Sequence, residues 1–283
     1  MTRDELAGAQ GAAGAARRGL SARARPYAVY LYPAAAIALV LIAWEIASRA
    51  GYFPRYLLPS PSGIAKRFME LRGLIVKESL VTLQEILLGF GLSVVVGIPL
   101  AVGLVSSRTF NRTIYPLVVG SQVVPKVGIA PLFIVWFGFG VTAKVLVAFL
   151  VAFFPIVVST VVGLRSIEVE KLYVARAAGA NAFQLFWLVR LPYALPSIFG
   201  GMKVSITLAV VGAIVGEFVA AESGIGRLLL SANGNMDTEL LFAGLFALIV
   251  IGAVLFLVME GLERLMLPWH VSQRLEASTR TTA

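Results

Sequence analysis

Three long stretches of this chain contain no charged side chain, at residues 86–107, 145–164 and 240–258. A helix needs about 20 mostly apolar residues to cross a bilayer, and inside lipid its backbone polar groups must be satisfied within the segment itself. The runs are continuous and show no alternation of apolar with polar residues, which argues against the short strands of a β-barrel. With 59% hydrophobic residues and a mean hydropathy of +0.88, the chain is predicted to be an all-α integral membrane protein.

Six membrane-spanning helices are expected, in one membrane domain over residues 27–267. The other spans are placed at 27–46, from 114 onward, and at 194–216, and a short amphipathic helix is expected at 64–74. Residues 1–26 are predicted to be a disordered cytoplasmic arm and 268–283 a cytoplasmic tail. Glycines in spans two and five are expected to let helices pack closely; they are Gly89, Gly91, Gly97, Gly103, Gly200, Gly201, Gly212 and Gly216.

The third span is unusual because Pro125 and Pro131 fall inside it. A broken helix is expected, and irregular backbone at membrane depth is tolerated only beside protein or a water-filled cavity. Ionisable groups inside a membrane deserve a functional hypothesis, so Gln122, Lys126 and Glu217 are candidates for lining a solute pathway. The alternatives are that Lys126 forms a structural ion pair or extends to the interface, and that Glu217 is an interfacial or structural partner. Glu85 is interpreted as a residue near the end of its span.

The formal charge of +9 is interpreted as a signal of membrane orientation, so we expect no nucleic-acid partner. More than half of the basic residues fall on the cytoplasmic side if the N-terminus lies inside, and this orientation is predicted. The basic residues of segment 50–78 run against it, partly offset by Glu70 and Glu78. The chain has no cysteine and a single histidine, so we expect neither a metal site nor catalytic residues.

One helix-patterned polar segment, residues 173–192, separates the fourth and fifth spans. It contains a cluster of small residues around Gly179, then nine residues, then Val189 and the pair Leu191-Pro192. Small residues would allow another protein to approach the backbone closely. The Leu-Pro pair is expected to mark the end of the helix, where the chain turns back to the membrane.

This spacing resembles the EAA loop of ATP-binding-cassette (ABC) importer permeases, which reads Glu-Ala-Ala, three residues, Gly, nine residues, a hydrophobic residue, one residue and Leu-Pro. Aligned on Gly179, Ala175 matches the third position of the pattern. Tyr173 stands where the family has glutamate, and Val174 replaces the first alanine. Segments LLPSPSGI, VPKVGIAPLFIVWFGFGVTAK and GAIVGEFVAAESGIGRLL resemble the branch that serves nitrate, taurine, sulfonates and bicarbonate, with relatives for thiamine-precursor pyrimidines and riboflavin.

The resemblance implies a type I importer permease fold with a cytoplasmic coupling helix in loop 165–192, in a bacterial cytoplasmic (inner) membrane protein. The implied partners are two ABC ATPase subunits, an external solute-binding protein, a second permease copy, expected to be identical, and the lipid bilayer. The coupling residues would be Tyr173, Ala175, Arg176, Ala177, Ala178, Gly179, Ala180 and Asn181. The chain itself has no G-x-x-x-x-G-K-[ST] phosphate loop. We therefore expect it to bind no cofactor, with ATP held by the partner.

The expected cargo is a small anion such as a sulfonate, taurine or nitrate, which Lys126 could attract. The alternative within the same class is a thiamine-precursor pyrimidine or a riboflavin-like solute. Two more remote alternatives are a secondary transporter driven by an ion gradient and a membrane scaffold or channel. The first predicts inverted repeats and charge relays that the sequence does not show, and the second leaves the spacing around Gly179 unexplained.

Overall fold

A computed structural model describes residues 32–51, 54, 56–220 and 222–268. The chain divides into two compact units, the first made of residues 1–62 with 271–283 and the second of residues 63–270. Within the first unit, the helix Tyr32–Arg49 matches the described part of the first expected span. The predicted N-terminal arm lies outside the described residues, and so does all of the predicted C-terminal tail except Pro268.

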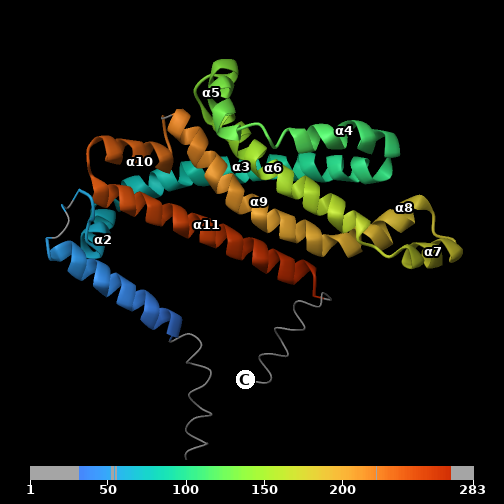
Figure 1. Cartoon of the computed structure of the whole chain (residues 1–283), viewed down its shortest axis with the longest axis horizontal. Coiled ribbons are helices and arrows are strands. Elements are labelled where there is room, and N and C mark those ends of the chain that lie inside the picture. Colours follow the sequence, from blue (N-terminus) through green and yellow to red (C-terminus); the bar gives the residue numbers. More distant parts are fainter. Residues whose placement is uncertain (1–31, 52–53, 55, 221, 269–283) are drawn as a thin grey trace, which may run out of the picture. The chain divides into compact units, whose positions relative to one another are not determined.

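The regular structure of the described residues is helical throughout (Figure 1), as the sequence predicts. In chain order, the helices after the first are α2 (Pro61–Glu70), α3 (Arg72–Ser106), α4 (Arg108–Gly120), α5 (Lys126–Phe137), α6 (Val141–Arg165), α7 (Val169–Ala177), α8 (Ala182–Gln184), the π-helix η1 (Leu185–Arg190), α9 (Leu191–Val219), α10 (Ile225–Gly234) and α11 (Thr238–Met266).

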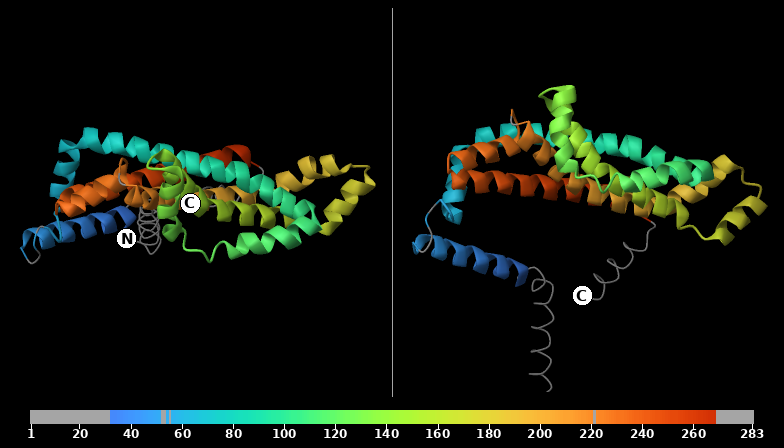
Figure 2. Two further views of the ribbon diagram at one scale, coloured as in Figure 1. Left: turned by 90° about the horizontal axis from the view of Figure 1, so that it is seen from above. Right: turned by 45° about the horizontal axis from the view of Figure 1, so that its top comes forward.

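Five helices of the described chain are long and apolar enough to cross a membrane, one for each of the six expected spans except the third. They are Tyr32–Arg49, α3, α6, the continuous helical stretch Ala182–Val219, and α11. The expected third span is broken, as the prolines predict, into α4 and α5. Pro125, which has no N–H to donate, is the N-cap residue of α5. α5 then projects from the long helices (Figures 1 and 2).

Helix α3 begins at Arg72, well before the boundary expected at residue 86. The helix is therefore longer than the expected span, because the charged residues before residue 86 do not interrupt it. In the structure Glu78 and Glu85 lie inside α3, and both are buried. The short amphipathic helix expected at 64–74 is present as α2, but it ends at Glu70.

The core of the second unit is the contact of α6 with α9 and α3, which glycines bring close together. A Cβ built on Gly89 would lie 2.6 Å from the Ala148 Cβ, and one built on Gly212 would lie 2.7 Å from the Ala148 Cα. Such spacings leave no room for a larger side chain, so the predicted role in packing is confirmed. It is confirmed also for Gly97, Gly103, Gly201 and Gly216, and it is wrong for Gly91 and Gly200, which face open space.

The long helices of the second unit lie side by side, so the unit has two distinct ends (Figures 1 and 2). One end carries α7 and α8. The other carries α10, the start of α3 and the start of α11. At this second end Arg67 of α2 donates two hydrogen bonds to Asp237, at 2.5 and 3.1 Å, and Asp237 also caps α11. This pair neutralises part of the basic segment that runs against the predicted orientation, and the Asp237 carboxylate raises the pKa of Arg67.

Candidate functional site

The turn after α7 is built around Gly179, whose φ of +85° lies in the left-handed region. Ala180 N–H donates to the Ala175 carbonyl at 3.1 Å and Gly179 N–H to the Arg176 carbonyl at 2.9 Å. These two bonds are the Schellman arrangement that ends helices at a glycine. Among the described residues a Cβ on Gly179 would meet nothing within 4 Å, so it is the left-handed backbone conformation that requires the glycine.

Asn181 starts the next helix through a reciprocal cap. Its side chain accepts from Gln184 N–H at 2.9 Å, and the Gln184 side chain accepts from Asn181 N–H at 3.0 Å. Together with the glycine turn, this capping box fixes the direction in which the chain leaves α7. The local sequence therefore specifies the shape of the loop through short-range hydrogen bonds to backbone N–H groups.

The expectation that Leu191-Pro192 ends a helix is wrong. The chain stays helical from Ala182 to Val219, and the pair forms the first residues of α9. The six residues before it form the π-helix η1. Pro192 cannot donate to the Leu188 carbonyl, and a wider π turn accommodates that missing bond without ending the helix.

The residues predicted to couple to a partner lie on and beside this turn, and most of them are exposed. The Tyr173 and Val174 side chains are 64% and 70% exposed. Arg176, Ala177, Ala178, Gly179 and Asn181 are exposed, and Ala175 and Ala180 are half-buried. Phe183 and Trp187, whose ring centroids are 6.0 Å apart, extend this surface along α8 and η1. The second unit thus presents an aromatic and apolar surface at this end.

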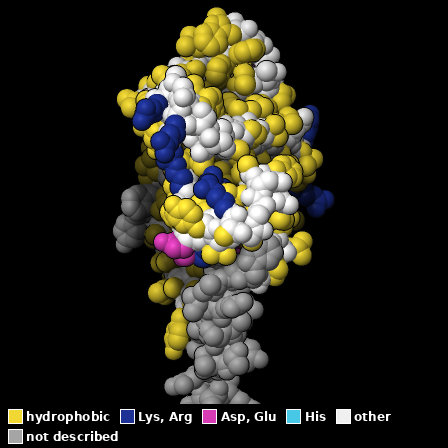
Figure 3. Space-filling view, turned by 90° about the vertical axis from the view of Figure 1, so that its right-hand side faces the viewer, with side chains coloured by type: hydrophobic (Ala, Val, Ile, Leu, Met, Phe, Trp, Pro, Cys, Tyr) yellow, Lys and Arg dark blue, Asp and Glu magenta, His cyan; other side chains and the backbone are white. Residues whose placement is uncertain are grey.

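Basic side chains surround that surface. Figure 3 shows Lys and Arg gathered over the end that carries α7 and α8. Lys171 binds Glu168 at 3.2 Å and lies 4.8 Å from the centroid of the Tyr193 ring, and the Glu168 carboxylate raises the pKa of this lysine. The other exposed basic residues of these loops are Arg108, Arg112, Arg165 and Arg176.

The three pathway candidates lie in different surroundings. Gln122 is exposed in the turn between α4 and α5, and Lys126 is half-buried as the first residue of α5. Glu217 is completely buried near the end of α9. Within the described residues, the hydrogen bonds and ion pairs join neither Gln122 nor Lys126 to Glu217.

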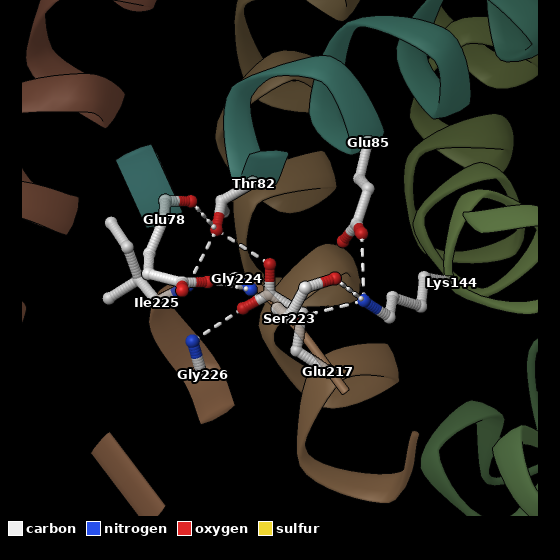
Figure 4. A network of polar contacts seen from close by, with 9 residues as sticks. All are labelled: Glu78, Thr82, Glu85, Lys144, Glu217, Ser223, Gly224, Ile225 and Gly226. Carbon is white, nitrogen blue, oxygen red and sulfur yellow. Dashed lines mark hydrogen bonds and ion pairs between the residues drawn. The ribbon is translucent and has the colours of Figure 1, made fainter. Parts of the chain in front are cut away.

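Glu217 instead belongs to a buried polar cluster at the end of the unit opposite α7 (Figure 4). Its carboxylate binds the Thr82 hydroxyl of α3 at 2.6 Å and Gly226 N–H of α10 at 2.5 Å. Thr82 in turn accepts from Ile225 N–H at 2.9 Å. The start of α10 is therefore attached to α3 and α9 by side chains that water cannot reach.

Lys144 is the buried cation of the cluster. It is 1% exposed, and its Nζ donates to Glu85 Oε1 at 3.0 Å, to the Ser223 carbonyl at 2.9 Å and to the Ser223 hydroxyl at 3.1 Å. Glu85 is completely buried, which corrects its interpretation as a residue near a span end. The ion pair links α3 to α6, and Ser223 adds the turn before α10.

Glu78 completes the cluster by accepting from Gly224 N–H at 2.6 Å and from Arg227 at 2.8 Å. The cluster is not evident from the sequence, because Lys144 directly precedes an uncharged run and resembles an ordinary residue at the edge of a span. The available signal was that Glu78, Thr82 and Glu85 recur at spacings that share one helix face. Chemically, the cluster can hold charges and protons away from water.

Comparison with known proteins gives consistent matches over most of the chain. The family model described as "Binding-protein-dependent transport system inner membrane component" matches residues 93–269. The riboflavin transport system permease protein RibX of Chloroflexus aurantiacus is 39% identical, over 83% of this chain and 88% of its own. The formylaminopyrimidine transport permease protein ThiX of Halalkalibacterium halodurans is 36% identical, over 86% and 97%. The taurine transport system permease protein TauC of Escherichia coli is 27% identical, over 83% and 88%.

Among solved structures, the MetNI methionine ABC transporter in inward-facing conformations is similar in fold. One of its chains matches with a TM-score of 0.61 and 21% sequence identity, over 70% of this chain and 98% of that chain. At this identity the match establishes the fold alone, which is the type I importer fold expected from the sequence.

Proposed function

Since this chain belongs to the family of binding-protein-dependent transport system inner membrane components, and is thus the multi-pass inner-membrane permease subunit of an ABC importer, we propose that its ATPase partner acts on the segment from Tyr173 to Asn181. ATP then stays on the partner, and this chain contributes the moving pathway. The observation that carries the proposal is the Gly179 turn, which holds exposed Tyr173 and Val174 at one end of the unit.

A rigid turn with an exposed apolar surface suits the transmission of force. The Schellman bonds and the capping box fix the turn, so a push on α7 is passed to α8 and not absorbed by a flexible loop. From α8 the chain continues through η1 into α9, which spans the unit. A displacement of the segment from Tyr173 to Asn181 is therefore transmitted along one continuous helical stretch to the end of the unit that carries α10.

The end that carries α7 and α8 faces the cytoplasm in this proposal, and the N-terminus does so too. The exposed arginines of the α3–α4 and α6–α7 connections lie at this end, and positive charge is retained on the cytoplasmic side of inner-membrane proteins. The external binding protein then delivers solute at the end that carries α10. Two ATPase subunits would serve two copies of this chain, because symmetric homodimers are the commonest assemblies.

The proposed solute is a small anion, with Lys126 and Gln122 as pathway candidates because both are accessible from outside the chain. A riboflavin-like or pyrimidine solute is the second candidate, and a specific observation favours it. The relatives named for riboflavin and formylaminopyrimidine are 39% and 36% identical to this chain, against 27% for the taurine permease.

The coupling proposal is tested by three substitutions of one residue. Gly179→Ala and Gly179→Trp place a Cβ on a left-handed backbone, at a cost of roughly 1–2 kcal/mol, whereas Gly179→Asn tolerates that conformation best among non-glycine residues. We expect transport-coupled ATP hydrolysis in proteoliposomes to fall for alanine and fall further for tryptophan, and to be kept largely by asparagine. Wild-type coupling in the tryptophan variant would overturn the proposal.

The solute is tested on the cognate binding protein, identified by copurification with the permease. Calorimetry with taurine, an alkanesulfonate, nitrate, riboflavin and formylaminopyrimidine separates the two classes. Binding of an anion alone would support the first candidate, and Lys126→Met should then raise the KM for uptake. Binding of a heterocycle alone would favour the second candidate and remove the argument for Lys126.

A further inference from the structure

The buried cluster has an odd number of charged groups. Three buried carboxyl groups, of Glu78, Glu85 and Glu217, face two cations, the buried Lys144 and Arg227, whose side chain is 35% exposed. With all five ionised, the cluster would carry one excess negative charge. An uncompensated charge out of reach of water costs so much free energy that the group takes up a proton instead.

Lys144 is one of the ionised groups. Its ammonium has three donors, and the structure gives each of them an acceptor, namely Glu85 Oε1, the Ser223 carbonyl and the Ser223 hydroxyl. A neutral amine would have one donor fewer than these acceptors. The lysine therefore does not account for the imbalance.

Glu78 is also ionised, because one carboxylate oxygen accepts from Arg227 and the other from Gly224 N–H. The remaining carboxyl groups are those of Glu217, whose two oxygens accept from Thr82 and Gly226 N–H, and of Glu85, which accepts from Lys144 on Oε1. Among the described residues, no hydrogen-bond partner is found for Glu85 Oε2, although this carboxyl group is completely buried. A buried oxygen that receives no hydrogen bond is where an additional proton would be accommodated.

We propose that this cluster is a proton-binding site, which holds one proton on the Glu85 and Glu217 carboxyl groups and exchanges it through the α9–α10 turn, residues 222–224. With the proton bound, the cluster is neutral and holds the turn against α3 and α6. Rising pH removes the proton, leaves a net negative charge and weakens the attachment of the turn. The attachment is therefore kept at lower pH and lost as the pH rises.

The helices packed around the Glu85 and Glu217 carboxyl groups carry the following charged side chains. α3 contributes Glu78, α6 contributes Lys144, and α10 contributes Arg227. In the turn itself Glu222 is exposed. α5 carries Lys126, which forms no ion pair within the described residues. Arg67 and Asp237, at the same end, pair with each other.

The proton itself can be observed by infrared spectroscopy of the full-length permease in lipid nanodiscs. A protonated carboxyl group has a carbonyl stretch that is distinct from the carboxylate bands and that shifts in D2O. We expect this band in the wild type at neutral pH and its loss at alkaline pH. Absence of the band from the wild type would overturn the proposal without any variant.

Substitutions assign the band. Glu85→Gln and Glu217→Gln should each fold, and the band should vanish from one of them, or weaken in both if the proton is shared. Glu222→Gln, in the same turn but exposed, is the matched control and should keep the band. A band that persists unchanged in both buried variants would place the proton elsewhere and overturn the proposal.

The count of charges gives an independent thermal test. In one of the two single variants, glutamine replaces a neutral acid with a neutral amide. The unfolding temperature of that variant should equal that of the wild type at neutral pH, and it should not fall at alkaline pH as that of the wild type does. The double variant leaves one excess positive charge and should unfold at a lower temperature than either single variant. A double variant as stable as the wild type would overturn the proposal.

The route of exchange rests on the proposed orientation, and it is tested separately. In sealed vesicles of known orientation, a pH jump on the side of α10 should remove the infrared band, whereas a jump on the side of α7 should not. Removal from the α7 side alone would contradict exchange through the turn. The Gly179 variants report on ATPase coupling and leave this result unaffected, so the two proposals can fail independently.

Discussion

The two polar regions of this permease are organised in opposite ways. The segment from α7 to η1 is exposed, and its shape comes from local hydrogen bonds to backbone N–H groups around Gly179 and Asn181. The cluster at the other end is buried, and side chains such as Lys144 and Glu217 make its bonds. Exposed side chains remain available to bind a partner, whereas buried ones bind the chain's own helices. Substitutions should therefore separate stability from coupling.

The largest effect is expected for Lys144→Met. Removal of one partner of a buried ion pair leaves the other charge uncompensated, at a cost of about 3–5 kcal/mol. Glu85 would lose the hydrogen bond that Oε1 accepts from Nζ, and Ser223 would lose both of its bonds to Nζ. We expect a marked fall in the thermal unfolding temperature and in the yield of monodisperse protein.

The double variant Lys144→Met/Glu85→Met is the control for that result. Replacing both members of a buried pair with apolar residues of similar volume is often close to neutral, so stability should largely return. A Lys144→Met variant as stable as the wild type would show that Lys144 contributes no net stability. The buried cluster would then not stabilise the fold more than the exposed segment does.

Sequence reasoning predicted the features that depend on local chemistry. Long uncharged runs predict spans, Pro125 predicts a helix break, and the spacing from Gly179 to Leu191-Pro192 identifies the family. The buried cluster depends on contacts between residues far apart in the chain, such as Thr82 with Glu217. A charged residue beside an apolar run is ordinarily a flank, and only tertiary packing shows that Lys144 is not one.

The continuity of η1 and α9 was missed for a different reason. A proline is expected to end a helix because it lacks an N–H and its ring meets the preceding turn. At Pro192 the six residues of η1 adopt the wider π turn, and the helix continues. Local propensity identifies the strained position correctly, but it does not predict how the backbone relieves the strain.

A smaller effect is expected for Gly216→Ala, which perturbs the buried cluster through the backbone. A Cβ on Gly216 would lie 2.9 Å from the Lys144 Cα, so α6 and α9 would have to separate. Overpacking of this kind costs about 1–3 kcal/mol. Gly200→Ala on the same helix faces open space, and it should gain up to about 1 kcal/mol from helix propensity. Denaturant unfolding of the two variants, compared directly, measures the packing effect; equal stabilities would contradict it.

The smallest change in stability is expected for Tyr173→Ala at the exposed end. The side chain is 64% exposed, and substitutions at such positions usually change stability by no more than about 0.5 kcal/mol. Coupling to ATP hydrolysis should nevertheless weaken, because aromatic side chains at the centre of an interface often contribute much of the binding free energy. Copurification with the ATPase and transport-coupled hydrolysis measure that loss, with Tyr56→Ala, another exposed tyrosine, as the matched control. A Tyr173→Ala variant that unfolds at a lower temperature but still copurifies with the ATPase would show that Tyr173 stabilises the fold and does not bind the partner. The two polar regions would then not differ in function.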